Sequence, residues 1–382
     1  MILGIDGYLG WPLALRLSAA GHKVSGMDNL FTRKAVQEVG SDSGLPILTM
    51  EERVQAAKEL KGFKIKFYKG DITKYKKLYS VIKREKPDAI IDFAEERSAP
   101  YSMRSHEHAA YSMQNNIVGT INLIYAVKEL NPNVHVIKMG TMGEYGTPNF
   151  DIPEAPYMKA TLGGKEDTIT TPKWAGSWYH WTKVHDTNNL LLANRLWGLT
   201  VTNIMQGPVY GTRTKDISDP RLFTRFDFDE TWGTVVNRYC AEAVLGIPLT
   251  VYGKGGQTRG FLSLEDSVEA LRLLVENPAE KGTFRTVNQF RELFSVMQLA
   301  EYVQTAAKSV DMDTTIGHME NPRIEKEEHY YNIDRKVLPA LGFDNLKRNI
   351  REELVSMLTD LNGQRPRLEQ YRSAVMPKTM WR

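Results

Sequence analysis

Cysteine is almost missing from this sequence: Cys240 is the single one among 382 residues. One cysteine excludes a disulfide within the chain and any zinc site built from several thiolates. Long apolar runs are missing too, because no stretch approaches the ~20 residues that a membrane helix needs. The N-terminus lacks the basic start and apolar core of a signal peptide. These absences predict a cytoplasmic protein that does not span a membrane.

A strong excess of one charge is also missing. The chain has 49 basic and 46 acidic residues, which gives a formal net charge of +3. No basic tract resembles a nucleic-acid-binding arm, so no nucleic-acid partner is expected. The histidines have no metal-ligand spacing, so no metal site is expected. An anionic ligand must therefore be held by a few well-placed arginines.

Apolar residues are plentiful and patterned. A hydrophobic content of 42% in 382 residues suffices for one large α/β unit and a smaller lobe. Runs rich in β-branched residues alternate with segments of helical period, which predicts a Rossmann-type, doubly wound parallel sheet. Only three residues precede Gly4, so the first strand is expected to be short. Further strands are expected at 22–27, 64–68, 89–93, 134–139 and 200–205, and helices at 12–20, 74–86, 116–130 and 179–196.

The composition changes after Gly207, where proline, glycine and aromatic residues become frequent. We therefore expect a dinucleotide-binding domain at 1–206 that contains a helix-bearing insertion at about 31–62. A segment at about 258–280 is expected to return to this domain. The smaller mixed α/β substrate lobe is expected at 207–257 and 281–345. The remaining 346–382 are expected to form a C-terminal helix and a surface arm.

Three glycines open the chain at intervals of three: Gly4, Gly7 and Gly10, with Tyr8 and Leu9 between the last two. In a strand–turn–helix context such glycines permit a tight turn, close approach of a pyrophosphate, and packing of the helix on the strand. The N–H groups at the start of the following helix are donors for phosphate. This motif predicts a dinucleotide cofactor.

Asp28 stands 21 residues after Gly7, at the end of the second expected strand. A carboxylate there accepts from an adenosine ribose 2′-OH and repels a 2′-phosphate, which favours NAD over NADP. Asp28 could instead cap the turn at Asn29, and Arg33 is near enough to accommodate NADP. Asp71, followed by Ile72, is a candidate for the adenine amino group or for a helix N-cap.

Tyr179 and Lys183 lie four residues apart and so share one helical face. An ammonium beside a phenol lowers the pKa of the phenol toward working pH, which suits a base that removes a carbinol proton. Tyr79 and Lys83 have the same spacing without any cofactor context. Thr141, which follows the fifth expected strand, distinguishes the first pair because its hydroxyl can contact the same substrate oxygen.

Together these residues resemble the extended short-chain dehydrogenase/reductase superfamily of nucleotide-sugar epimerases and dehydratases. From Gly4 to about Leu341 the chain resembles, more narrowly, the family of UDP-sulfoquinovose synthases. The segments that carry the narrower resemblance are 28–30, 96–103, 140–149, 252–260, 321–323 and 327–332. The resemblance implies bound NAD, the substrates UDP-glucose and sulfite, and a homodimer through the helices that begin near Asn116 and Tyr179.

That family's chemistry implies oxidation at sugar C4, loss of water across C5 and C6, addition of sulfite at C6, and return of hydride to C4. Related 4,6-dehydratases carry an Asp-Glu pair after the catalytic threonine, but here Met142 and Gly143 occupy those positions. An ordinary dehydratase is therefore disfavoured. We expect His180 or Tyr145 to handle C5 and C6, with Glu144 as a further candidate.

Sulfite addition needs a cationic pocket beside C6, for which Arg97 is the candidate. Arg259 and Arg323 are expected to bind the diphosphate, with Arg238 as an alternative to either. Gln206 is expected to orient the sugar, and Tyr252 to contact uracil.

Two other functions remain compatible with the sequence. A UDP-glucose 4-epimerase would use the same threonine, tyrosine, lysine and NAD. A catalytically inactive NAD-responsive binding protein is the alternative from another class, because a fold does not determine an activity.

Overall fold

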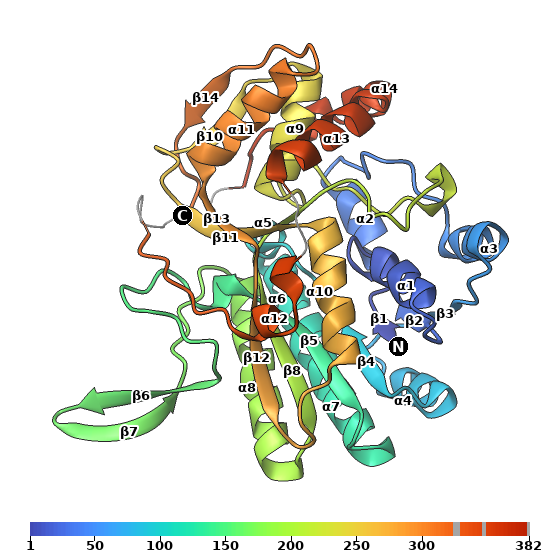
Figure 1. Cartoon of the computed structure of the whole chain (residues 1–382), viewed down its shortest axis with the longest axis vertical. Helices are drawn as coiled ribbons and strands as arrows, with labels where there is room; N and C mark the ends of the chain where they lie inside the picture. The colour runs from blue at the N-terminus through green and yellow to red at the C-terminus, as the bar shows by residue number, and fades with distance from the viewer. Residues whose placement is uncertain (324–328, 346–348, 380–382) are drawn as a thin grey trace.

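The computed structural model of the chain describes residues 1–323, 329–345 and 349–379. Its largest feature is a seven-stranded sheet with the order β12-β8-β5-β4-β1-β2-β3, in which every neighbouring pair is parallel (Figure 1). The Rossmann-type prediction is therefore confirmed. The strands are β1 (Ile2–Leu3), β2 (Ser25–Asp28), β3 (Lys66–Lys69), β4 (Ala89–Asp92), β5 (His135–Thr141), β8 (Thr200–Gln206) and β12 (Phe284–Gln289).

Helices cover both faces of this sheet, which explains why its central strands are almost continuously apolar. Because successive side chains in a strand point to opposite faces, neighbouring residues enter different cores. Ile91 packs with α1 (Gly10–Ala19), α3 (Met50–Lys61) and α10 (Leu264–Glu276). Ile90 packs with α4 (Tyr75–Glu85), α7 (Gly119–Leu130) and α8 (Trp178–Trp197).

The first strand has only two residues, as predicted from the few residues that precede Gly4. It nevertheless lies at the centre of the sheet. Ile2 pairs with Gly26 of β2 and with Ile91 of β4. The Met1 ammonium donates to the Ala89 carbonyl at 2.8 Å, which continues the ladder by one more residue.

The expected insertion after β2 contains α2 (Phe31–Glu38) and α3. Thr49 and Glu52 form a capping box at the start of α3, because each side chain accepts from the backbone N–H of the other. The helix expected near 50–60 is therefore present.

The smaller lobe has its own core. Three helices pack against one another there: α9 (Val235–Leu245), α11 (Val296–Lys308) and α13 (Ile350–Asn362). They accompany the three-stranded sheet β13-β11-β9 and the pair β10-β14, at the top of Figure 1. These strands are β9 (Val209–Tyr210), β10 (Leu249–Tyr252), β11 (Thr258–Ser263), β13 (Glu292–Ser295) and β14 (Ile316–Met319).

The boundary expected between the two lobes is wrong in detail. β12 was placed in the substrate lobe, but all six of its residues pair with β8 of the large sheet. Conversely, β11 was expected to return to the first domain, but it belongs to the small lobe's sheet. The returning unit is α10 with β12, because the apolar face of α10 packs against the large sheet.

The expected surface arm at the C-terminus is also wrong. Leu368 of α14 (Arg365–Gln370) and Val375 are fully buried in the core of the small lobe. Arg367 fastens the segment by donating to the Ser43 carbonyl at 2.7 Å. Apolar residues at the end of the chain thus complete the core that α9, α11 and α13 form in the small lobe.

A hairpin between β5 and α8 was not predicted. Its strands β6 (Tyr157–Leu162) and β7 (Lys165–Thr170) pair only with each other and project from the body at the lower left of Figure 1. The remaining elements are short: α5 (Ala99–Ser102), α6 (His106–Met113), a π-helical turn (Gln114–Val118), 3-10 turns (Met142–Glu144, Pro220–Leu222, Phe343–Asn345, Arg372–Ala374) and α12 (Val337–Ala340).

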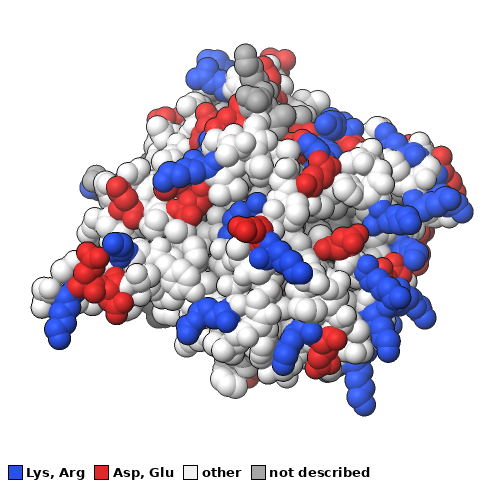
Figure 2. Space-filling model, turned by 60° about the horizontal axis from the view of Figure 1, so that its bottom comes forward, with Lys and Arg blue, Asp and Glu red and all other residues white. Residues whose placement is uncertain are grey.

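Acidic and basic side chains are interspersed on the face drawn in Figure 2, in keeping with the small net charge. Within the described ranges, no helix is both long and apolar enough to cross a bilayer.

The burial of the C-terminal segment can be tested with a pair of leucines. Leu368→Ala should lower the free energy of unfolding by about 2–5 kcal/mol, because it removes a fully buried side chain and leaves a cavity. Leu162→Ala, in the hairpin, should change it by less than about 0.5 kcal/mol, because that side chain is 73% exposed. Urea unfolding measures both, and equal effects would contradict the packing described for the C-terminus.

Candidate active site

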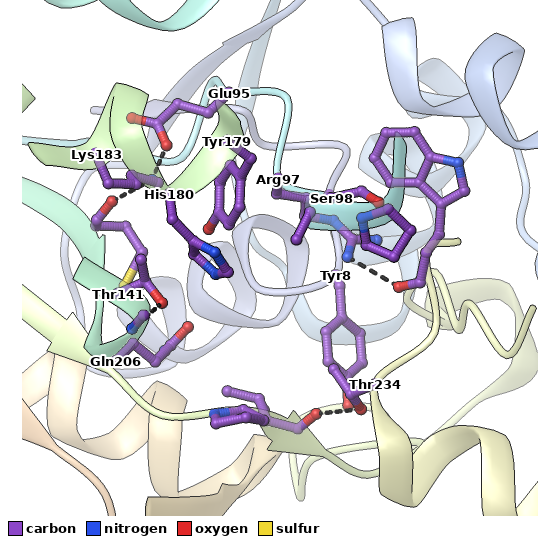
Figure 3. Close-up of a pocket in the computed structure, with 18 of the residues that line it drawn as sticks. Tyr8, Glu95, Arg97, Ser98, Thr141, Tyr179, His180, Lys183, Gln206 and Thr234 are labelled. Carbon is purple, nitrogen blue, oxygen red and sulfur yellow. Dashed lines mark hydrogen bonds and ion pairs between the residues drawn. The ribbon is translucent and has the colours of Figure 1, made fainter. Parts of the chain in front are cut away.

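A cavity of about 870 Å³ lies between the carboxyl ends of the parallel strands and the small lobe. Its wall begins at the turn after β1 and continues through the ends of β2, β4 and β5 to residues of the small lobe. This is where open parallel sheets bind their ligands. Figure 3 shows the part of the wall that carries the residues with chemical function.

The glycine turn lines this cavity and has no room for side chains. Gly4 has a φ of +81°, and a Cβ at Gly10 would lie 2.2 Å from the Gly4 carbonyl oxygen. The start of α1 therefore packs directly on the end of β1, with Tyr8 and Leu9 on the cavity wall. This close-packed turn, open to the cavity, fits a dinucleotide pyrophosphate.

Asp28 lies on the cavity wall at the end of β2, as predicted. Its carboxylate accepts from the backbone N–H of Asp6 at 2.9 Å and of Leu30 at 2.7 Å. Burial, followed by the nearby Asp6 carboxylate, raises the pKa of Asp28 to about 6. Asn29 also lines the cavity and accepts from the N–H of Phe31.

Arg33 does not reach the cavity wall. Its guanidinium donates twice to the Asp6 carboxylate, both at 2.8 Å, and to the Leu48 carbonyl. The predicted contact of Arg33 with the cofactor is therefore wrong in this structure, because a closer carboxylate holds the side chain.

Asp71 likewise bonds locally. Its carboxylate accepts from the N–H and the hydroxyl of Thr73, at 2.8 and 2.7 Å. Gly70 and Ile72 line the cavity, whereas Asp71 does not. Asp71 is not the N-cap of α4 either, because that position is Lys74; its carboxylate instead stabilises the turn before the helix.

The structure brings Thr141, Tyr179 and Lys183 together on one wall, although they come from β5 and α8 (Figure 3). Ser177 caps α8 by accepting from the N–H of His180, and the N–H of Tyr179 donates to Ser102 at 3.1 Å. These bonds fix where the helix starts and hence where its first turn faces. The Thr141 hydroxyl accepts from the N–H of Gly143 at 3.1 Å.

The Lys183 ammonium lies 5.6 Å from the centre of the Tyr179 ring. It donates to the Met139 carbonyl at 2.5 Å and forms an ion pair with Glu95. Burial lowers the pKa of Lys183 to about 8, an effect that the carboxylates of Asp186 and Asp92 oppose.

The pKa of Tyr179 is not lowered as the sequence predicted. Burial raises it well above its ordinary value, and the Glu96 carboxylate adds to the effect, while Arg97 and Lys138 oppose it. Desolvation outweighs the cations because a phenolate inside the protein loses its hydration. The Tyr179 phenol is therefore protonated at physiological pH.

His180 lies on the cavity wall beside Tyr179, with the two ring centres 4.9 Å apart. Its Nδ1 lies 2.9 Å from the Ser177 hydroxyl. Burial lowers the pKa of His180 to about 3, and the positive charges of Arg323 and Arg259 add to this effect. The imidazole is therefore neutral at physiological pH.

Gly143 provides the space that His180 occupies. A Cβ at position 143 would lie 2.4 Å from the Cδ2 atom of the imidazole. Any side chain at this position would displace the ring, so the glycine found where dehydratases carry an acid has a steric reason.

Glu144 and Tyr145 lie behind the cavity wall, not on it. Glu144 is fully buried, where it accepts from the Thr141 N–H at 3.3 Å and from the Thr187 hydroxyl at 2.8 Å. The Tyr145 hydroxyl donates to Asn288 at 2.8 Å, and the side chain is 2% exposed. Their predicted direct action on the substrate is therefore wrong in this structure; both support the turn that presents Thr141.

Four arginines line the cavity, which makes it suitable for anions. Arg97 forms an ion pair with Asp227 and lies 5.5 Å from the Trp232 ring. Arg238 donates to the Tyr252 hydroxyl at 2.9 Å. The other two are the predicted Arg259 and Arg323.

Gln206, also on the wall, donates to Ser267 at 2.9 Å and to Gln289 at 2.8 Å, which orients its amide.

Sequence reasoning missed several residues of the wall. Glu95 lies on this wall shortly after the end of β4. A carboxylate that follows a buried strand is a signal of a ligand site that sequence analysis can use. Asn115 lies in the π-helical turn and lines the cavity, and its amide donates to Asn116 at 2.9 Å. Trp232 and Thr234 have no signal in the sequence, because their loop meets the cavity only in the tertiary structure.

Comparisons with known proteins agree with this geometry. The model of the NAD dependent epimerase/dehydratase family matches residues 1–288. The UDP-sulfoquinovose synthase of Sulfolobus acidocaldarius is 58% identical over 382 residues, which cover 100% of this chain and 97% of the relative. The chloroplastic UDP-sulfoquinovose synthase of Spinacia oleracea is 41% identical over 385 residues, which cover 100% of this chain and 79% of the relative.

Solved structures show the same fold. A UDP-glucose 4-epimerase of Thermotoga maritima, solved with UDP-glucose, has a TM-score of 0.69 at 18% identity over 98% of this chain and 99% of its own. One from Bifidobacterium longum, in complex with NAD+ and UDP, has a TM-score of 0.68 at 18% identity over 95% and 98%. The resemblance predicted from the sequence is thus confirmed, and the chain belongs to the NAD dependent epimerase/dehydratase family.

Proposed function

We propose that the protein is an NAD-dependent UDP-sulfoquinovose synthase, which converts UDP-glucose and sulfite to UDP-sulfoquinovose and water. The observation that carries this proposal is the convergence of Thr141, Tyr179, Lys183 and the neutral His180 on one arginine-lined cavity. The two relatives with that name, similar over the whole of this chain, support it.

The glycine turn and Asp28 are the residues that would hold NAD. Asp28 suits a ribose with a free 2′-hydroxyl, and the nearest arginine, Arg33, is bound to Asp6 rather than free to meet a 2′-phosphate. Bound NAD would supply the acceptor for the C4 hydride and the donor that returns it.

Tyr179 is the proposed base for the C4 hydroxyl proton, with Thr141 contacting the same oxygen. Because the pKa of Tyr179 is raised, its phenol ionises only when a positive charge lies close to it. Lys183 and Arg97 are cationic groups of the same wall, and the charge of Arg97 already opposes the rise in the pKa of Tyr179.

His180 is the proposed group for C5 and C6. Once C4 is a ketone, the C5 proton is acidic, and the neutral imidazole is able to take it. The C6–O bond then breaks, and the imidazolium returns the proton to the departing hydroxyl, which leaves as water. Sulfite adds to C6 through sulfur, C5 takes up a proton that bisulfite or solvent supplies, and C4 is reduced.

Anionic ligands would be bound by the arginines. Arg97 lies near Tyr179 on the cavity wall and is proposed to guide sulfite to C6 (Figure 3). Arg259 and Arg323 are proposed to bind the diphosphate of the nucleotide sugar, with Tyr252 against uracil and Gln206 at the sugar.

A homodimer is proposed through α7 and α8. Both helices leave large apolar side chains exposed, which is unusual for a helix face without a partner. The exposed side chains are Tyr125 (41%), Leu192 (50%) and Leu196 (59%).

The activity is tested by incubating the protein with NAD and UDP-glucose, with and without sulfite, followed by mass spectrometry. We expect a sulfite-dependent UDP-sugar in which sulfonate replaces hydroxyl. Tyr179→Phe should reduce its formation by at least about 10²-fold, because the C4 proton loses its acceptor. Tyr79→Phe is the control and should retain activity, because Tyr79 and Lys83 have the same spacing but no cofactor context. UDP-galactose formed regardless of sulfite would indicate an epimerase instead.

The role of His180 has its own readout. His180→Gln should lower kcat about 10²–10⁴-fold and abolish exchange of the C5 hydrogen with D₂O, while UDP-glucose still reduces bound NAD at C4. Because the pKa of His180 is held at about 3, we expect no loss of wild-type activity from its protonation between pH 5 and 8. His22→Gln, on the surface, is the control. Retention of C5 exchange in His180→Gln would exclude this role.

The proposed dimer is tested by placing a charge on its face. Leu192→Asp should convert the protein to a monomer in light scattering, because burying a carboxylate in an apolar interface is costly. Leu293→Asp adds the same charge at a side chain of the small lobe that is 41% exposed, and should leave the mass unchanged. A wild-type protein that is monomeric, or a Leu192→Asp dimer, would refute this interface.

A further inference from the structure

A group of five buried charged side chains lies beneath the catalytic wall. Two of them are ammonium groups and three are carboxylates, and none of the side chains is more than 3% exposed. The members are Asp92, Glu95, Lys138, Lys183 and Asp186. We call this group the lysine network.

Glu95 joins the two lysines. Its carboxylate forms one ion pair with Lys183 and another with Lys138. Lys138 in turn lies 2.8 Å from Asp92 and 3.2 Å from Asp186, and it donates to the Thr120 hydroxyl at 2.8 Å. In Figure 3, Glu95 and Lys183 face each other behind Tyr179 and His180.

Stability alone does not account for such a group. Removing several charges from water has a large free-energy cost, and a buried ion pair recovers that cost only in part. Buried charges that are retained beside a catalytic lysine therefore indicate a functional constraint. The network also holds one more carboxylate than ammonium, which favours the protonated state of both lysines.

We propose that Glu95 is a positioning residue, which holds the Lys183 ammonium at the catalytic wall and keeps it protonated. This inference rests on the proposed role of Lys183 beside Tyr179. Glu95 and the Met139 carbonyl both contact the ammonium, and these two contacts fix its position at the wall. A neutral or displaced Lys183 would leave a Tyr179 phenolate without the cation that opposes its burial.

The charged and titratable groups around Lys183 come from three elements. The β4 end contributes Asp92 and Glu95, β5 contributes Lys138, and α8 contributes Asp186 and Tyr179. Burial lowers the pKa of Lys183 to about 8, so its ammonium is lost as the pH rises through that value. Loss of the Glu95 carboxylate should lower this pKa further, because an opposite charge in contact favours the charged form.

The test measures the ionisation of Lys183 itself. The protein is labelled with lysine carrying ¹³C at the ε-carbon and titrated by NMR, and the Lys183 resonance is assigned by its loss in Lys183→Met. Glu95→Gln keeps the shape of the side chain and removes its charge. We expect the Lys183 pKa to fall by about one unit or more in this variant.

Glu96→Gln is the matched control for the titration. Glu96 is the next residue, fully buried, with a pKa raised to about 7 by burial, but it bonds to Ser98 and Ser112 and to neither lysine. It should leave the Lys183 titration unchanged. Glu95→Asp, which keeps the charge, should restore part of the lost pKa and serves if Glu95→Gln does not fold. An unchanged Lys183 pKa in Glu95→Gln, or an equal shift in Glu96→Gln, would overturn the proposal.

A kinetic readout links the network to catalysis. When UDP-glucose is mixed with the NAD-loaded protein, absorbance at 340 nm reports oxidation at C4. In Glu95→Gln the alkaline limb of this rate should move to lower pH by the same amount as the NMR titration. A shifted NMR titration with an unshifted limb would overturn the catalytic link. Because the NMR titration needs no substrate, it stands whether or not the protein makes UDP-sulfoquinovose.

Discussion

Burial of both faces of the parallel sheet is the constraint on which the rest of the structure depends. Helices α1, α3 and α10 cover one face and α4, α7 and α8 the other, so ligands reach only the edge where the strands end. Parallel strands end at the same edge, and this brings together residues far apart in the chain. Gly4, Asp28, Glu95 and Thr141 each follow or end a strand of this sheet and meet there.

Desolvation then sets the charge of each catalytic group. It raises the pKa of the Tyr179 phenol, lowers that of the Lys183 ammonium to about 8 and lowers that of His180 to about 3. One cause thus gives a protonated phenol, a lysine close to its titration range and a neutral imidazole. Nearby charges modify these values, and the lysine network and the arginines of the wall are the charges in position to do so.

The small lobe closes the site from the other side. Its residues Arg238, Tyr252 and Arg259 line the cavity, and its core includes the C-terminal Leu368 and Val375. The chain end therefore supports the lobe that completes the anion-binding wall. Such an arrangement suits an anionic nucleotide sugar, which must be held at its diphosphate while chemistry proceeds at the distant hexose.

The sequence by itself determined the Rossmann-type sheet, the glycine turn, Asp28, and the proposed catalytic residues Thr141, Tyr179 and Lys183. These rest on local patterns: apolar period, glycine spacing and the four-residue repeat of a helix. Only the tertiary structure decided that Arg33 turns to Asp6 and that Glu144 and Tyr145 lie behind the wall. It also decided that Glu95 meets Lys183 and that burial raises the pKa of Tyr179. Ion pairing and desolvation depend on which distant residues surround a group, and no local pattern in the chain encodes those neighbours.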